Sequence, residues 1–197
     1  MFLFLGKVLA VKYNPEIHHR KSIRLKGYDY LQDGAYFITI CVENRECLFG
    51  KIVNREMQLN EAGKMIQKWW LELKNKFSNL ELDVFVVMPN HFHGVVVLQK
   101  YGGADLCICP KTKKMGERVN KKTGEHVGSL PEIIQWFKTM TTNAYILGVK
   151  SGKFPPFDRR VWQRNYYEHI IRNEKSWEKI KNYIIQNPER WKNDKFL

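Results

Sequence analysis

The 197-residue sequence has no long apolar run. A membrane-spanning helix needs about 20 consecutive apolar residues, and the apolar stretch at residues 1–11 is interrupted by Gly6 and Lys7. That stretch also lacks the basic start and the small-residue cleavage site of a secretory signal. We therefore expect a cytoplasmic protein with no membrane partner, in which residues 1–26 form a basic N-terminal arm.

Cysteine is scarce as well. The four cysteines are Cys41, Cys47, Cys107 and Cys109, and no two of them form a Cys-x-x-Cys pair. So few cysteines in a chain of this size exclude a disulfide framework, and the missing pair argues against a structural zinc site. We expect reduced thiols without a structural role.

Acidic residues are also few, because 20 Asp and Glu stand against 33 Lys and Arg, which gives a net charge of +13. Such a surplus favours a polyanionic partner. Residues 27–98 carry a net −2, whereas residues 1–26, 99–126 and 150–182 carry +5, +4 and +5. Basic segments around a slightly acidic core are typical of a surface that follows phosphates, although a merely solubilising surface is the alternative.

The chain shows no internal repeat and no break in composition, so we expect one domain over residues 27–197, with a flexible basic insertion at 99–127. Hydrophobic periodicity and capping residues predict the following elements. They are strands at 34–42, 81–88, 91–98 and 161–171, a hairpin at 48–59, and helices at 61–77, 129–147 and 174–187. Without the hairpin and the last helix, this order is βαββαβ. It predicts an α+β, ferredoxin-like antiparallel sheet with helices on one face, plus a C-terminal helix that carries Tyr183.

The segment 88–94 (MPNHFHG) contains two histidines on a predicted strand. Because side chains alternate along a strand, His91 and His93 share one face and Phe92 points to the other. Two imidazoles at this spacing can bind one divalent metal, and we expect Gly94 to leave room beside them. A pair of surface or hydrogen-bonded histidines is the alternative, and a metal would need a third ligand from elsewhere.

The last predicted helix offers such a ligand. Tyr183 and Asn187 are four residues apart and lie on one helical face, with Lys179 one turn earlier. The neighbouring apolar stripe of Trp177 and Ile184 should face the sheet. Asn187 has an amide oxygen suited to Mg²⁺ or Mn²⁺. The alternative is that Tyr183 packs near a helix end with its hydroxyl in water.

Four blocks of the sequence occur in a characteristic order. They are residues 20–30 followed by 34–39, residues 87–94 (VMPNHFHG), residues 162–172 (WQRNYYEHIIR) and residues 183–188 (YIIQNP). Together they span about residues 20–191 and resemble the REP-associated tyrosine transposases, which belong to the single-tyrosine HUH transposases. The resemblance implies a ferredoxin-like fold, which agrees with the order of the predicted elements.

The resemblance also implies roles for particular residues. His91 and His93 would bind a divalent metal, Mg²⁺ or Mn²⁺, and Asn187 would be the third ligand, where relatives often carry Gln. Tyr183 would be the nucleophile, with Tyr166 as the second choice. The implied activity is metal-dependent cleavage and strand transfer of single-stranded, hairpin-containing DNA through a covalent 5′-phosphotyrosine, by a monomer or a homodimer.

Single strands are held by basic grooves and by aromatic stacking. The candidate DNA-binding residues are Arg20, Lys21, Arg24, Lys26, Lys138, Arg159, Arg160, Trp162, Arg164 and Tyr166. One alternative is a non-catalytic module for single-stranded nucleic acid on the same fold, which gives no reason for the histidines and Tyr183. Another is a replication initiator or relaxase, which is commonly larger. A zinc hydrolase is disfavoured because no Glu or third His lies at a suitable spacing.

Overall fold

The computed structural model describes residues 27–99, 126–194 and 196. The elements are β1 (Gly34–Cys41), β2 (Gly50–Val53), β3 (Glu56–Leu59), α1 (Glu61–Lys76), β4 (Leu80–Val87), β5 (His91–Leu98), α2 (Leu130–Lys150), β6 (Tyr167–Ile171) and α3 (Glu174–Gln186), with short 3₁₀ turns η1 (Glu43–Arg45) and η2 (Trp191–Asn193). The expected N-terminal arm and most of the expected basic insertion lie outside the described residues.

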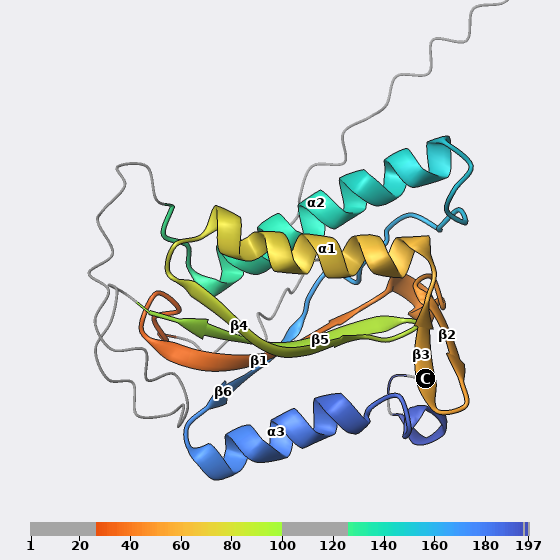
Figure 1. Cartoon of the computed structure of the whole chain (residues 1–197). Coiled ribbons are helices and arrows are strands. Elements are labelled where there is room, and N and C mark those ends of the chain that lie inside the picture. The colour runs from red at the N-terminus through yellow and green to blue at the C-terminus, as the bar shows by residue number, and fades with distance from the viewer. Residues whose placement is uncertain (1–26, 100–125, 195, 197) are drawn as a thin grey trace, which may run out of the picture.

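Strands β4, β5, β1 and β6 pair in that order into an antiparallel sheet. Helices α1 and α2 cover one face of this sheet, and α3 lies against the other (Figure 1). We call them the helix-pair face and the α3 face. The strand order and the position of the two helices confirm the predicted α+β, ferredoxin-like fold. The β2–β3 hairpin forms a separate two-stranded sheet within the described chain.

Local sequence signals set where the helices begin. The Asn60 side chain accepts a hydrogen bond from the Gly63 amide at 2.9 Å, and the Asn173 side chain does the same for Ser176. These are N-cap contacts, which satisfy amides that have no partner in the first helical turn. The amide of Ser129 donates to Glu132 at the start of α2.

Two predicted boundaries are wrong. Helix α2 does not end near Gly148 but continues to Lys150. A Cβ atom at position 148 would lie 2.1 Å from the Phe154 ring, so the glycine lets this ring pack closely against the helix. The predicted strand at 161–171 begins only at Tyr167. Within residues 161–166, Trp162 makes an isolated bridge to Val42, so the apolar residues of this segment are buried without a continuous ladder.

The two faces of the sheet bury different cores. The helix-pair face packs large side chains, including those of Trp70, Phe92 and Phe137, whereas a smaller cluster with Trp177 and Ile184 lies under α3. The expectation for Gly94 is also wrong. A Cβ atom at Gly94 would lie 2.6 Å from the Trp70 ring, so this glycine makes room for a core tryptophan rather than beside the histidines.

Within residues 27–99 and 126–194, none of the helices is both long enough and apolar enough to cross a membrane.

Candidate active site

The two histidines of β5 lie on the α3 face, fully buried, with ring centroids 4.5 Å apart. One nitrogen of each ring is held by a neighbour. His91 Nδ1 donates to the Asn90 side-chain oxygen at 2.7 Å, and His93 Nδ1 lies 2.8 Å from the Thr39 hydroxyl oxygen. Such partners fix the orientation of a ligating imidazole. The Nε2 atoms are then the ones directed at Asp194 and Tyr183.

Asp194 completes a group of three metal-binding side chains. It follows η2 at the C-terminal end of the described chain, and its Oδ2 atom lies 3.8 Å from His91 Nε2. The ligand atoms of His91, His93 and Asp194 all lie within 4.8 Å of one another. Two imidazole nitrogens and a carboxylate oxygen suit a divalent cation. The sequence interpretation missed Asp194, because it follows the last helix without a spacing pattern that would join it to the histidines.

Tyr183 reaches this group from α3. Its hydroxyl oxygen lies 3.4 Å from His93 Nε2, and its ring packs edge-on against the rings of His93 and Phe37 at 5.3 and 6.0 Å. Helix α3 packs on β4, and Trp177 and Ile184 are buried beneath it, as their spacing predicts. The histidine strand and the tyrosine helix, far apart in the sequence, therefore meet on one face of the sheet.

Asn187 is buried beside Tyr183, with 2% of its surface exposed. Its side chain makes a hydrogen bond with the Tyr183 hydroxyl, whereas its Oδ1 atom has no hydrogen-bond partner among the described residues. A buried amide oxygen without a partner is costly and calls for an explanation. An oxygen that is directed toward a cation site would account for it.

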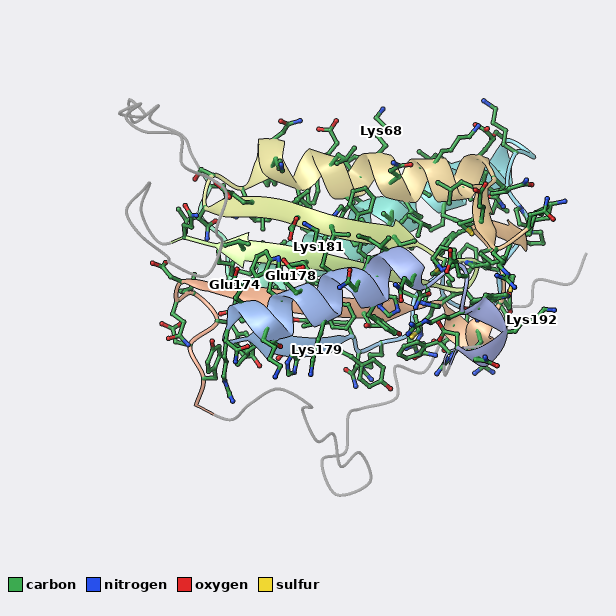
Figure 2. All side chains as sticks on the ribbon, turned by 60° about the horizontal axis from the view of Figure 1, so that its bottom comes forward. Lys68, Glu174, Glu178, Lys179, Lys181 and Lys192 are labelled. Carbon is green, nitrogen blue, oxygen red and sulfur yellow. The ribbon has the colours of Figure 1, made fainter. Side chains whose placement is uncertain are left out.

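The environment of Tyr183 raises the pKa of its phenol above the usual value. Burial is the main cause, and the nearby carboxylate of Asp194 adds to it, while the hydrogen bond from Asn187 acts in the opposite direction. The phenol is therefore protonated at neutral pH. Lys179, one turn earlier on α3, is exposed, as are Glu174 and Glu178 on the same helix, whereas Lys181 is half-buried (Figure 2).

Three arginines that were predicted to bind DNA are exposed between α2 and β6. They are Arg159, Arg160 and Arg164. The loop that carries them is tied to the end of β1, because the Gln163 amide donates to the Cys41 carbonyl oxygen at 2.8 Å. Cys41 pairs with His91 across the sheet, so this loop lies at the histidine end of the sheet.

The other described candidates for DNA binding are directed into the protein. Lys138 uses its ammonium group internally, donating to the carbonyl oxygens of Gln163 and Arg164 at 2.6 and 3.0 Å. Trp162 and Tyr166 are buried in the core of the helix-pair face. Neither ring offers an open face for stacking, and Tyr166 is separated by the sheet from the histidines. The candidates on the arm, Arg20, Lys21, Arg24 and Lys26, lie outside the described residues.

Comparison with known proteins identifies a relative. A Haemophilus influenzae protein described as uncharacterised is 43% identical over 187 residues, which cover 94% of this chain and 97% of the relative. The chain belongs to the family of that protein. No family model matches the present chain.

A solved structure of a REP-associated tyrosine transposase bound to a REP hairpin aligns with 87% of this chain and 74% of that chain. The TM-score is 0.52 and the sequence identity is 17%. At this identity the likeness shows a shared fold.

Proposed function

We propose that this protein is a metal-dependent single-stranded DNA endonuclease and strand transferase, a transposase of the single-tyrosine HUH type. It would act on hairpin DNA through a covalent 5′-phosphotyrosine. The observation that carries the proposal is the 3.4 Å approach of the Tyr183 hydroxyl to His93 Nε2, beside the group of His91, His93 and Asp194. The four ordered sequence blocks and the shared fold add support.

The side chains present fit a divalent cation. His91, His93 and Asp194 would hold it, and the buried Oδ1 atom of Asn187, which has no hydrogen-bond partner in the part of the chain that the structure describes, would offer a further oxygen. Oxygen ligands favour Mg²⁺ or Mn²⁺. When bound, such a cation polarises the scissile phosphate and stabilises negative charge in the transition state.

Tyr183 supplies the covalent chemistry. Its phenolic oxygen attacks phosphorus, a phosphorus–tyrosine oxygen bond forms, and the bond to the 3′ oxygen breaks. The phenolic proton leaves to solvent, and the departing oxygen takes up a proton to become a free 3′-hydroxyl. In the second step, a 3′-hydroxyl attacks the phosphotyrosine and releases Tyr183 as the phenol. Because a phosphodiester is replaced at each step, rejoining needs no ATP.

Basic residues near the histidine end of the sheet would hold the strand. Arg159, Arg160 and Arg164 are exposed there, and the sequence adds four more basic residues at 20–26. Arginine is suited to phosphate because its planar guanidinium binds two oxygens at once. The affinity for DNA should therefore fall steeply with salt.

The decisive variant is Tyr183→Phe, with Tyr166→Phe as the matched control. Each protein is incubated with a pool of hairpin-containing single strands and Mn²⁺, and the covalent adduct is separated by denaturing electrophoresis. Tyr183→Phe should form no adduct while still binding DNA, because it lacks only the attacking oxygen. Tyr166→Phe should still form the adduct. EDTA should abolish adduct formation by the wild-type protein and by Tyr166→Phe. An adduct with Tyr183→Phe, or unchanged cleavage in excess EDTA, would contradict the proposal.

A further inference from the structure

A pocket of about 400 Å³ lies on the α3 face of the sheet, beside the candidate active site. Its lining includes Phe37 and Thr39 from β1, Tyr167 and His169 from β6, and Arg45 and Phe196. We call it the β1–β6 pocket. Helix α3 packs on β4, at the opposite edge of the sheet, and the pocket lies over the two strands farther from β4.

The pocket shares a wall with the site around Tyr183. The Phe37 ring lines the pocket and packs against both His93 and Tyr183, at centroid distances of 5.3 and 6.0 Å. Thr39 also lines the pocket and contacts His93 Nδ1 at 2.8 Å. A molecule in the pocket would therefore lie one side chain away from the proposed nucleophile.

Tyr167 gives this pocket an aromatic platform. It stands opposite Thr39 in the β1–β6 register, and 53% of its surface is exposed. Its ring lies 6.2 Å from that of Phe196, which is buried against both histidines. An exposed aromatic ring beside a pocket can gain contact area from a planar ligand, and stacking of this kind holds the bases of single strands.

Arg45 brings a cation to the same pocket, on a strained turn. Asn44 and Arg45 have φ values of 54° and 59°, in the left-handed region that non-glycine residues rarely adopt. Such conformations cost free energy and cluster at functional sites. The turn is held by the Asn90 side chain, which donates to the Arg45 carbonyl oxygen at 3.3 Å. The guanidinium carbon lies 5.0 Å from the centroid of the Phe196 ring.

We infer that the β1–β6 pocket is a nucleotide subsite for single-stranded DNA. One base stacks on Tyr167, and Arg45 contacts the adjoining phosphate, next to the phosphate that Tyr183 attacks. The nature of the ligand rests on the proposed function. Glu168 also lines the pocket, but it stands opposite Ile38 in the β1–β6 register, so its side chain points to the helix-pair face, where the carboxylate accepts a hydrogen bond from the Tyr30 hydroxyl. The chain as a whole carries +13, which matches a polyanionic strand.

The test measures stacking without cleavage. The full chain is titrated, in EDTA, into hairpin oligonucleotides that carry one 2-aminopurine at successive positions of the single-stranded flank. The fluorescence of one position should be quenched more than that of its neighbours. Tyr167→Ala should remove this quenching and weaken binding roughly tenfold. Tyr167→Phe should retain both, because the ring remains.

Two further variants define the subsite. Arg45→Gln should weaken binding to all sequences and lower the salt slope by about 0.7, the value for one phosphate contact on a single strand. Leu147→Ala, which truncates an exposed apolar residue on α2, should change neither property. An equal effect of Leu147→Ala and Tyr167→Ala would show a nonspecific loss and contradict the inference.

The outcomes separate this inference from the proposed function. If quenching depends on Tyr167 but no covalent adduct ever forms, the subsite stands and the nuclease proposal fails. If the adduct forms and Tyr167→Ala leaves affinity and quenching unchanged, the nuclease proposal stands and the subsite is refuted. Failure of the wild-type chain to bind any of the oligonucleotides would also refute the subsite.

Discussion

The two faces of strand β5 differ in chemistry although they come from the same eight residues. Phe92 and Val96 point to the helix-pair face and pack in an apolar core with Trp70 and Phe137. His91 and His93 point to the α3 face, where they meet polar side chains of β1 and α3 and the Asp194 carboxylate. Because successive side chains of a strand point to opposite faces, the residues of β5 that stabilise the core lie on one face and the residues of the candidate site lie on the other. Substitutions on one face should affect one property and leave the other.

The largest expected effect is a loss of stability when the core of the helix-pair face is disrupted. Phe92→Ala should lower the free energy of unfolding by about 3–5 kcal/mol, because Phe92 is fully buried and its truncation leaves a cavity next to Trp70. Urea denaturation followed by tryptophan fluorescence measures the change. A loss below about 1 kcal/mol would mean that this face does not dominate stability.

An intermediate effect is expected on metal affinity at the α3 face. Asp194→Asn should weaken Mn²⁺ binding by about 10- to 100-fold, comparable to the cost of disturbing partners around a metal site. The reason is that the carboxylate charge is lost while the shape of the side chain is kept. Isothermal titration with Mn²⁺ measures the affinity. The control is Asp158→Asn, which changes an exposed aspartate in the loop between α2 and β6. Equal Mn²⁺ affinities for the two variants would show that Asp194 does not bind the metal.

The smallest effect concerns the stability of the α3 face. Asn187→Ala should change the free energy of unfolding by no more than about 1 kcal/mol, because the loss of the hydrogen bond to Tyr183 is offset by the removal of a buried amide oxygen that lacks a partner among the described residues. Thermal unfolding in EDTA measures this. A large destabilisation would show that Asn187 is retained for packing, and would weaken the contrast between the two faces.

Much of the fold could be predicted because local signals agreed with tertiary packing. Asn60 caps α1, and the alternation at 91–93 correctly placed two histidines on one face. The start of β6 was mispredicted because the apolar residues at 161–166 are buried without regular pairing. Periodicity reports burial, and it cannot tell a strand from a buried irregular segment.

The candidate site was predicted in part, for a related reason. Helical spacing joined Tyr183 to Asn187, and strand alternation joined His91 to His93, because both pairs obey local geometry. Asp194 obeys neither rule. Its approach to His91 depends on how the chain turns after α3 through η2, which depends on tertiary packing. The same limit applies to Tyr166, because only the folded chain shows that it lies on the opposite face of the sheet.

The central claim is that Tyr183 forms the covalent bond to DNA, and mapping the adduct by mass spectrometry tests it most directly. The wild-type protein is incubated with hairpin-containing single strands and Mn²⁺, then digested with nuclease and trypsin. Cleavage after Lys181 and Arg190 releases residues 182–190, whereas residues 165–172 carry Tyr166 and Tyr167. The account predicts a nucleotide on Tyr183 in the first peptide, joined through its 5′ phosphate. A nucleotide found on the second peptide would contradict it.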